Sequence, residues 1–382
     1  MVHTPEKVDI HRDFTLLIDG KNAFPEILRC MEQAKKSIRI NMFIWRDDAI
    51  GNRIAAAVLG AADRGVAVDI SVDRYGVVLE KAEECKRSFF HKRQTAVEKI
   101  KSKTLALLYS APGVPQDAAD RETALYRSVM AHPQIRVSRD VFKADHSKFY
   151  IFDDEVLILG GINIEDKENG CDRQGRQYQD YMVKLVGREY VEAFCAELER
   201  GEKKAKDYFF GVNVKEPVRR FEMERLYLNL IDSARKELTI TMAYFSPLPA
   251  FLKAIAAAHR RGVRVSVLVP EWANFQSDSN HKTVKKLLRM TDNGVTVYRS
   301  PKMVHTKLVA NEEMVSFGSC NITKKAFAQL SELNLFARRE DSAFARSLLD
   351  SVAAEQRLAQ KVKNWRSVRY NPILAWLEGF LV

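Results

Sequence analysis

The feature that most constrains the fold of this chain is an internal repeat. Residues 23–45 and 225–247 share one pattern, which is a helical run of apolar positions, a basic turn and an alternating strand that ends in aromatic residues. A second helix then ends at Gly65 or at Gly262, where glycine supplies the left-handed conformation of a C-cap, and a valine-rich strand follows. Because the matches occur in the same order in both halves, the sequence predicts a duplicated α/β unit.

The repeat also predicts the domains. A charged stretch at 199–220 separates the copies, so that we expect an N-terminal half over residues 1–205 and a C-terminal half over residues 206–350. Residues 351–382 would form a basic and aromatic tail. The valine-rich strands are typical of strands buried on both faces, so each half should hold a mostly parallel or mixed sheet flanked by helices.

The first copy is longer than the second and carries an insert at about residues 77–143. Within it, residues 85–109 are basic, with apolar positions at helical spacing. Two interpretations stay open for this segment. It is either a helix that covers the core, or a basic amphipathic surface that meets lipid or guards the site.

Each half contains a predicted strand that begins with His-x-Lys, namely His146 and Lys148 in the first copy and His305 and Lys307 in the second. Residues two apart on a strand point to the same face. If the halves pair about a pseudo-twofold axis, two imidazoles and two ammonium groups therefore meet in one pocket. A single His-x-Lys is common and a lone histidine is more often structural, but two copies in duplicated halves favour a catalytic pair.

A short turn after each strand ends in asparagine, which is Asn163 in GGIN and Asn321 in GSCN. Glycine lets the backbone approach a ligand closely, and an asparagine amide can donate hydrogen bonds to phosphoryl oxygens. We therefore expect phosphate-binding positions at Gly161, Asn163, Ser319 and Asn321.

Such a pocket suits a phosphodiester. The lysines and the amides would neutralise and hold the phosphoryl oxygens, one imidazole would attack phosphorus, and the other would protonate the leaving oxygen. The second imidazole would then deprotonate the incoming hydroxyl. No metal and no cofactor is expected, because the lysines supply the positive charge.

The two motifs resemble the HxKxxxxD and G-G/S-x-N signature of the phospholipase D superfamily. The first copy fits fully, with Asp153 at the acidic position, whereas the second carries Glu312 there. In the superfamily this acid supports the local hairpin more than the chemistry. The resemblance covers nearly the whole chain, from about Leu16 to about Phe336, and within the superfamily it is strongest to the bacterial cardiolipin synthases.

The resemblance implies a transphosphatidylase, which transfers a phosphatidyl group from one phospholipid, typically phosphatidylglycerol, to the hydroxyl of another. His146 would be the nucleophile, and His305 the general acid and then the base. An acidic residue downstream of each motif would orient the histidine, and the matching positions are Asp180 after the first motif and Glu332 after the second.

The formal net charge of +11 favours a polyanionic partner, which could be an anionic membrane surface, a phosphorylated substrate or a nucleic acid. Phospholipid is the expected substrate. Hydrolysis of phospholipids, a phosphodiesterase or nuclease acting on nucleic acid, and a non-catalytic lipid-binding protein remain alternatives. The sequence does not predict the oligomeric state.

Five scattered cysteines without a CxxC spacing, an N-terminus without a signal peptide and the lack of a long apolar run predict a cytoplasmic protein. We expect it to associate peripherally with the inner face of the membrane. The tail combines basic residues with Trp365, Tyr370, Trp376 and Phe380, and it is either an interfacial anchor or a helix docked on the second half.

Overall fold

The structure is a computed structural model. It describes residues 9–381 except 75, 77–86, 91–99, 101–121, 140–143, 173, 203–205 and 218. Most of the expected insert, including nearly all of the segment 85–109, lies outside the described residues, and both interpretations of it stay predictions.

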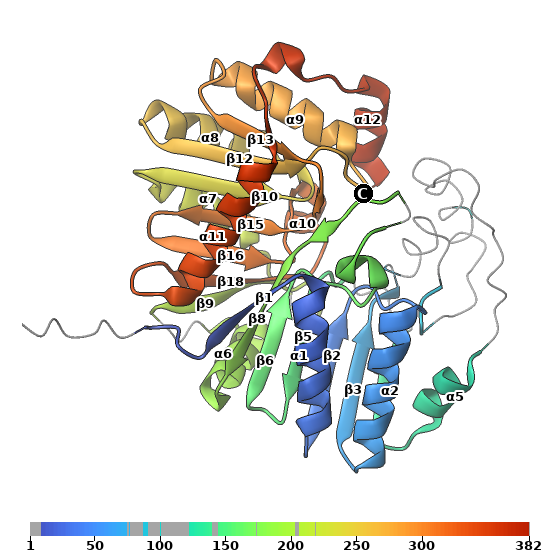
Figure 1. Ribbon diagram of the computed structural model, residues 1–382. Coiled ribbons are helices and arrows are strands. Elements are labelled where there is room, and N and C mark those ends of the chain that lie inside the picture. Colours follow the sequence, from blue (N-terminus) through green and yellow to red (C-terminus); the bar gives the residue numbers. More distant parts are fainter. Residues whose placement is uncertain are drawn as a thin grey trace, which may run out of the picture.

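The N-terminal half is built on a seven-stranded mixed sheet (Figure 1). Its strands, in sheet order, are β1 (Phe14–Ile18), β8 (Tyr181–Val186), β6 (Val156–Gly160), β5 (Phe149–Phe152), β2 (Ser37–Met42), β3 (Ala67–Val72) and β4 (Ile135–Ser138). Only β2, β3 and β4 pair in parallel. The other elements of this half are α1 (Asp19–Gln33), α2 (Ala49–Asp63), α5 (Ala124–Ala131), η1 (Asp166–Asn169), β7 (Tyr178–Gln179) and α6 (Arg188–Arg200).

The C-terminal half repeats this order in an eight-stranded sheet. Its strands are β9 (Tyr208–Asn213), β18 (Glu332–Arg338), β16 (Met314–Gly318), β15 (Lys307–Asn311), β10 (Glu237–Met242), β12 (Arg264–Pro270), β13 (Thr296–Ser300) and β19 (Gln360–Lys361). The further elements are α7 (Met223–Ser233), β11 (Phe245–Ser246), α8 (Pro249–Arg260), α9 (Ser277–Met290), β14 (Met303–Val304), β17 (Ile322–Thr323), α10 (Lys324–Ala328), α11 (Ala343–Leu358), η2 (Trp365–Ser367) and α12 (Pro372–Leu381). The predicted duplication into two α/β halves is confirmed.

The correspondence between the halves refines two expected boundaries. Helix α5 and strand β4 occupy the places of α9 and β13, so this part of the expected insert 77–143 belongs to the repeated core. Helix α11 is the counterpart of α6 and runs to Leu358, so the tail begins about eight residues later than the expected position 351.

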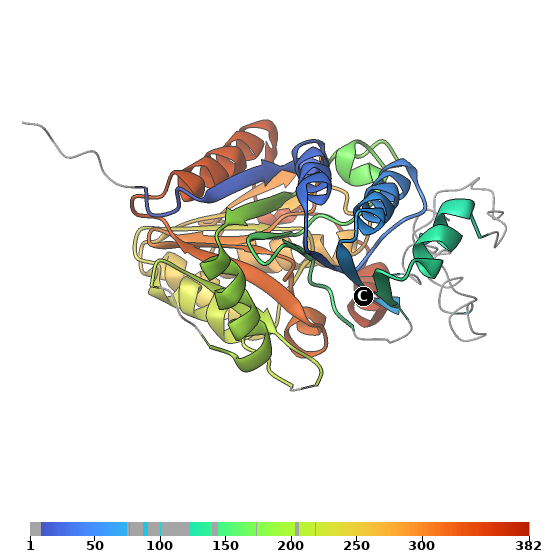
Figure 2. The same ribbon diagram turned by 90° about the horizontal axis from the view of Figure 1, so that it is seen from below.

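The two sheets face each other across a shared apolar core. That core takes side chains from both sheets, such as Phe149 and Val183 from the first and Leu308 and Leu335 from the second. A second apolar cluster fills the space between the first sheet and its outer helices, and a third fills the same space in the second half. Figure 2 shows the helices flanking the strands when the molecule is seen from below. Burial of apolar side chains on both faces explains why the strands are valine-rich runs without strict alternation.

An acidic residue stands in the turn between β5 and β6 and in the turn between β15 and β16, and each bonds to the start of a neighbouring strand. The Asp153 carboxylate accepts hydrogen bonds from the backbone N–H groups of residues 35, 36 and 37, at the start of β2. The Glu312 carboxylate accepts the equivalent bonds from residues 235, 236 and 237, at the start of β10. The longer glutamate side chain therefore reaches the same backbone groups, and the departure from aspartate leaves the local structure intact.

The tail is docked on the second half. Strand β19 pairs with β13, and Val362 and Val368 are buried in the core of that half. Helix α12 lies beside α9 (Figure 1), and its Glu378 accepts a hydrogen bond from the backbone N–H of Ser279 at 2.7 Å. Within the described part of the chain, no helix is both long enough and apolar enough to cross a bilayer.

Candidate active site

A cleft between the two halves brings the repeated motifs together. His146 and Asn163 from the first half and His305 and Asn321 from the second all line it. About 690 Å³ of space lies in the cleft, including space that is open to solvent. The two imidazoles thus face one cavity, as the pseudo-twofold pairing predicts.

Short backbone ladders between the halves place the histidines. Strand β14, just before His305, pairs in parallel with β7, and the backbone N–H of His305 donates to Gln179 at 2.8 Å. On the other side, the backbone N–H of His146 donates to Ser331 at 2.8 Å. Because Gln179 and Ser331 each precede a carboxylate residue, every histidine is aligned with an acid of the opposite half.

The histidine–carboxylate pairs are accordingly crossed. Nδ1 of His146 lies 3.0 Å from Glu332, and Nδ1 of His305 lies 2.9 Å from Asp180. The expectation that each acid orients the histidine of the motif it follows is corrected here. The reason is that the backbone of Gln179 and of Ser331, the residues just before the two acids, bonds to the histidine of the other half. With Nδ1 held by a carboxylate, Nε2 of each ring is directed to the cleft.

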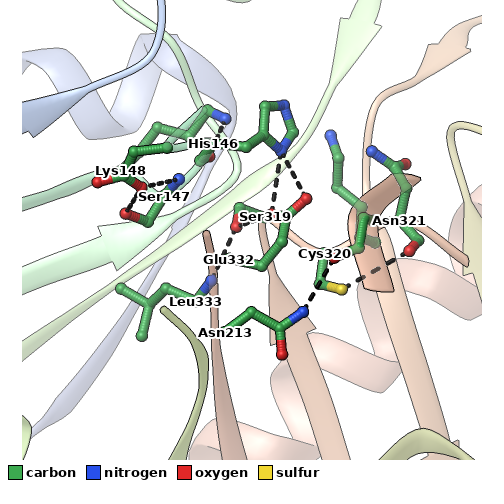
Figure 3. A network of polar contacts seen from close by, with 12 residues as sticks. His146, Ser147, Lys148, Asn213, Ser319, Cys320, Asn321, Glu332 and Leu333 are labelled. Carbon is green, nitrogen blue, oxygen red and sulfur yellow. Dashed lines mark hydrogen bonds and ion pairs between the residues drawn. The ribbon is translucent and has the colours of Figure 1, made fainter. Parts of the chain in front are cut away.

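The motif lysines lie behind the histidines. Nζ of Lys148 donates to the carbonyl oxygen of His146 at 2.5 Å (Figure 3), and Nζ of Lys307 donates in the same way to His305. Both lysine side chains are fully buried. Burial lowers the pKa of Lys148 to about 7, with Lys307 as a further cause, and burial lowers the pKa of Lys307 as well.

Gly161 and Ser319 support the carboxylates rather than face the cleft, which corrects the expectation that they bind phosphate. A Cβ atom at Gly161 would stand 2.2 Å from a carboxylate oxygen of Asp180, so glycine leaves room for that acid. At the equivalent position the Ser319 hydroxyl donates to Glu332 (Figure 3). Neither residue is among the described residues that line the cleft.

The two asparagines do reach the cleft. The side-chain oxygen of Asn321 accepts a hydrogen bond from the backbone N–H of Tyr244 at 3.2 Å, which leaves its NH2 group as the part able to donate to a substrate. The nitrogen of Asn163 lies 3.5 Å from Glu165, and its oxygen is buried without a hydrogen-bond partner among the described residues.

The charge balance of the cleft favours an anionic ligand. Burial, followed by the two motif lysines, holds the pKa of His146 and of His305 well below the ordinary value, which favours the neutral form of both rings. Burial raises the pKa of Glu332 to about 8 and that of Asp180 to about 7. A bound phosphodiester adds negative charge beside the rings and raises their pKa again, which prepares an imidazole to carry a proton.

Several residues of the site escaped the sequence analysis. Glu168 is buried on η1, with a carboxylate oxygen 3.4 Å from Nδ1 of His305, so this ring faces two acids whereas His146 faces Glu332. Lys167 and Lys325 also line the cleft. A signal for the lysines was present, because each stands four residues after a motif asparagine.

No group of three or more histidine, cysteine, aspartate or glutamate side chains in the described ranges is arranged to hold a metal ion. The groups that face the cleft are nucleophiles, bases, amides and cations. Together they can hold a phosphodiester, form a phosphorus–nitrogen bond and move a proton to and from an alcohol oxygen.

Two matches to a family model cover residues 27–200 and 227–351, and the model describes the cardiolipin synthase, phospholipase D-like domain. The chain belongs to this family and is a phospholipase D-type transphosphatidylase. It is 25% identical over 367 residues to cardiolipin synthase B of Escherichia coli K12, an alignment that covers 88% of this chain and 78% of the relative. It is 22% identical to cardiolipin synthase 2 of Staphylococcus epidermidis, over 96% of this chain and 72% of the relative.

Solved structures agree on the fold. The phosphatidylserine synthase of Haemophilus influenzae Rd KW20 superposes with a TM-score of 0.68 at 13% identity, covering 97% of this chain and 93% of that one. The polyphosphate kinase of Porphyromonas gingivalis gives a TM-score of 0.55 at 13% identity, over 97% of this chain and 54% of that one. At these identities the likeness concerns the architecture alone.

Proposed function

We propose that this enzyme transfers a phosphatidyl group between two phospholipids, with phosphatidylglycerol as donor and acceptor, through a phosphohistidine. The observation that carries this proposal is the convergence of two carboxylate-held imidazoles on one cleft between the halves. Such a pair supplies a nucleophile and a separate acid–base group, which is what a two-step transfer requires.

In the first step Nε2 of His146 attacks the donor phosphorus. The bond from phosphorus to the headgroup oxygen breaks, His305 gives its Nε2 proton to that oxygen, and glycerol leaves. His305 is assigned as the acid by its place in the second motif. The carboxyl group of Glu168 also lies beside its Nδ1, and burial raises the pKa of that group, so it can share a proton with the ring. Lys148, Lys307, Asn163 and Asn321 would offset and hold the charge on the phosphoryl oxygens.

In the second step the neutral His305 takes the proton of the acceptor hydroxyl. The acceptor oxygen attacks phosphorus, the bond from phosphorus to His146 breaks, and a lipid with two phosphatidyl groups on one glycerol is released. Water in place of the acceptor would give phosphatidic acid. No step uses a metal ion, since the lysines provide the positive charge.

The decisive experiment incubates the purified protein with phosphatidylglycerol vesicles and, separately, with single-stranded DNA, both in the presence of EDTA. We expect the doubly phosphatidylated lipid and one glycerol per transfer. Phosphatidic acid alone would show hydrolysis, cut DNA would show a nuclease, and vesicle binding without any product would show a lipid-binding protein. Activity that appears only without EDTA would contradict the metal-independent mechanism.

We also propose that the surface of α12 and the loop before α9 contacts an anionic membrane. Trp272, Ile373 and Trp376 are 63%, 70% and 59% exposed on two segments that lie close together, because α12 packs on α9. Residues 356–377 contain five lysines and arginines but no aspartate or glutamate. Exposed tryptophans beside such a basic stretch are typical of proteins that bind the headgroup region.

Substituting Ile373 and Trp376 together by serine should weaken binding to vesicles that contain phosphatidylglycerol by at least about ten-fold, measured by co-sedimentation. The fold should be kept, since both side chains are mostly exposed. Val186→Ser, which changes an exposed apolar residue of the first half, is the matched control. Equal binding of all three proteins would leave the tail as a packing element only.

A further inference from the structure

Two lysines outside the His-x-Lys motifs repeat with the duplication. Lys167 follows Asn163 by four residues, and Lys325 follows Asn321 by four residues, in the shared pattern Asn-Ile-x-x-Lys. Both side chains line the cleft. The motif lysines, by contrast, are fully buried behind the histidines and bonded to their carbonyl oxygens. The cleft therefore has a second tier of lysines, which line it directly.

The second-tier lysines are crossed between the halves, as the carboxylates are. After burial and the two motif lysines, Lys325 is a further cause that lowers the pKa of His146. Lys167 acts in the same way on His305. Each of these lysines therefore acts electrostatically on the histidine of the opposite half, and both lysines and both histidines line the same cleft.

The lysines of this tier are additional to the groups that would hold the reacting phosphodiester. A donor phosphodiester brings one negative charge to a centre that already contains Lys148, Lys307 and two asparagine amides. Water or glycerol as the acceptor brings no charge. A phospholipid acceptor differs, because it brings its own phosphodiester, separated from the reacting hydroxyl by the carbons of the headgroup.

We propose that Lys325 and Lys167 bind a second phosphodiester, that of the acceptor, and so select a phosphorylated alcohol over water or a neutral alcohol. This subsite rests on the proposed transfer function and adds the feature that separates transfer from hydrolysis. The acceptor would lie in the cleft with its hydroxyl at His305 and its phosphodiester against the second-tier lysines.

The two lysines contribute unequally. Nζ of Lys167 lies 3.3 Å from Glu165, which also binds Arg46 at 2.5 Å, and it stands 5.0 Å from the ring centre of Tyr178. In the second half Thr323 occupies the position of Glu165. Lys325 is half-buried whereas Lys167 is only 3% exposed, so we assign Lys325 as the main cation for the acceptor and Lys167 as a fixed partner. Burial lowers the pKa of Lys325 to about 8, which an incoming anion would raise again.

A competition between two soluble acceptors tests this subsite. Glycerophosphoglycerol and diglycerol have the same number of hydroxyl groups, but only the first carries a phosphodiester. With phosphatidylglycerol as donor, both compete for one phosphatidyl-enzyme, so the product ratio reports acceptor selection independently of the donor step. We expect the wild-type enzyme to favour glycerophosphoglycerol by at least about ten-fold, Lys325→Met to bring the ratio near one, and Lys325→Arg to keep the preference.

Lys324→Met is the matched control, because Lys324 is exposed on the same helix and is not among the described residues that line the cleft. A wild-type ratio near one, or an unchanged ratio in Lys325→Met, would overturn the subsite while phosphatidyl transfer still occurs. Should Lys325→Met be inactive, the wild-type ratio and that of Lys325→Arg still decide. If neither acceptor receives a phosphatidyl group, the transfer function itself fails.

Discussion

Replacing His146 by alanine is expected to abolish the covalent phosphoryl intermediate and to lower phosphatidyl transfer by at least about 10⁴-fold. The expected loss is large because His146, with its Nδ1 held by Glu332, is the group assigned to attack phosphorus. Removing a nucleophile leaves only binding and charge stabilisation, as in other enzymes with covalent intermediates. The measurement is a quenched reaction with phosphorus-labelled phospholipid, in which the phosphohistidine bond is stable to alkali and labile to acid.

The control for this experiment is His259→Ala, since His259 lies on α8 and is not among the described residues that line the cleft. That variant should form the intermediate at the wild-type level. Normal turnover by His146→Ala would end the assignment of His146 as the nucleophile. Labelled protein in His146→Ala that disappears in His305→Ala would reverse the two roles.

The crossed carboxylates make a second strong prediction, which distinguishes the two acids. An aryl phosphodiester has a leaving group that departs without a proton, so its first step needs His146 but not His305. With this donor, Glu332→Gln should slow formation of the intermediate by about 10²- to 10⁴-fold. Asp180→Asn should form the intermediate at nearly the wild-type rate and then accumulate it, because His305 no longer deprotonates the acceptor efficiently.

The opposite pattern, in which Asp180→Asn blocks formation of the intermediate and Glu332→Gln traps it, is what pairing within each half would give. The single-turnover yield of labelled protein therefore tests the crossed arrangement directly. Thermal unfolding of both variants serves as the control for folding. Ser319→Ala should behave as a weaker form of Glu332→Gln, because the serine hydroxyl donates to that carboxylate.

The parts of this protein that sequence could predict are those that local patterns record. The duplicated order of helices and strands and the His-x-Lys and Gly-x-Asn segments are visible because each repeats within one chain. The convergence of the histidines followed from one symmetry argument. The argument from the side-chain period of a strand did not hold, because both histidines stand before their strands and the motif lysines do not line the cleft. Glu312, which replaces the aspartate of the second motif, supports the local hairpin as expected, because its carboxylate accepts hydrogen bonds from the equivalent backbone groups.

The crossed pairing could not be predicted, because it depends on backbone ladders between segments such as β7 and β14 that are more than a hundred residues apart. Ser319 and Gly161 were expected to bind phosphate because the sequence gives no reason to separate them from the asparagine of the same turn. The structure separates the asparagine, which faces the cleft, from the residue two positions before it, which supports an acid. Lys167 and Lys325 are a different case. Their repeated spacing is visible in the sequence, but only the structure shows that both side chains line the cleft.

The backbone ladders between the halves have a consequence for how this protein can be divided or can evolve. A half produced alone would contain a histidine without its acid and an acid without its histidine, so it would lack both dyads at once. Mixing the two separately produced halves should restore both sites together or neither. Since each copy carries the groups that complete the other, a mutation that loosens their contact disables nucleophile and acid in a single event.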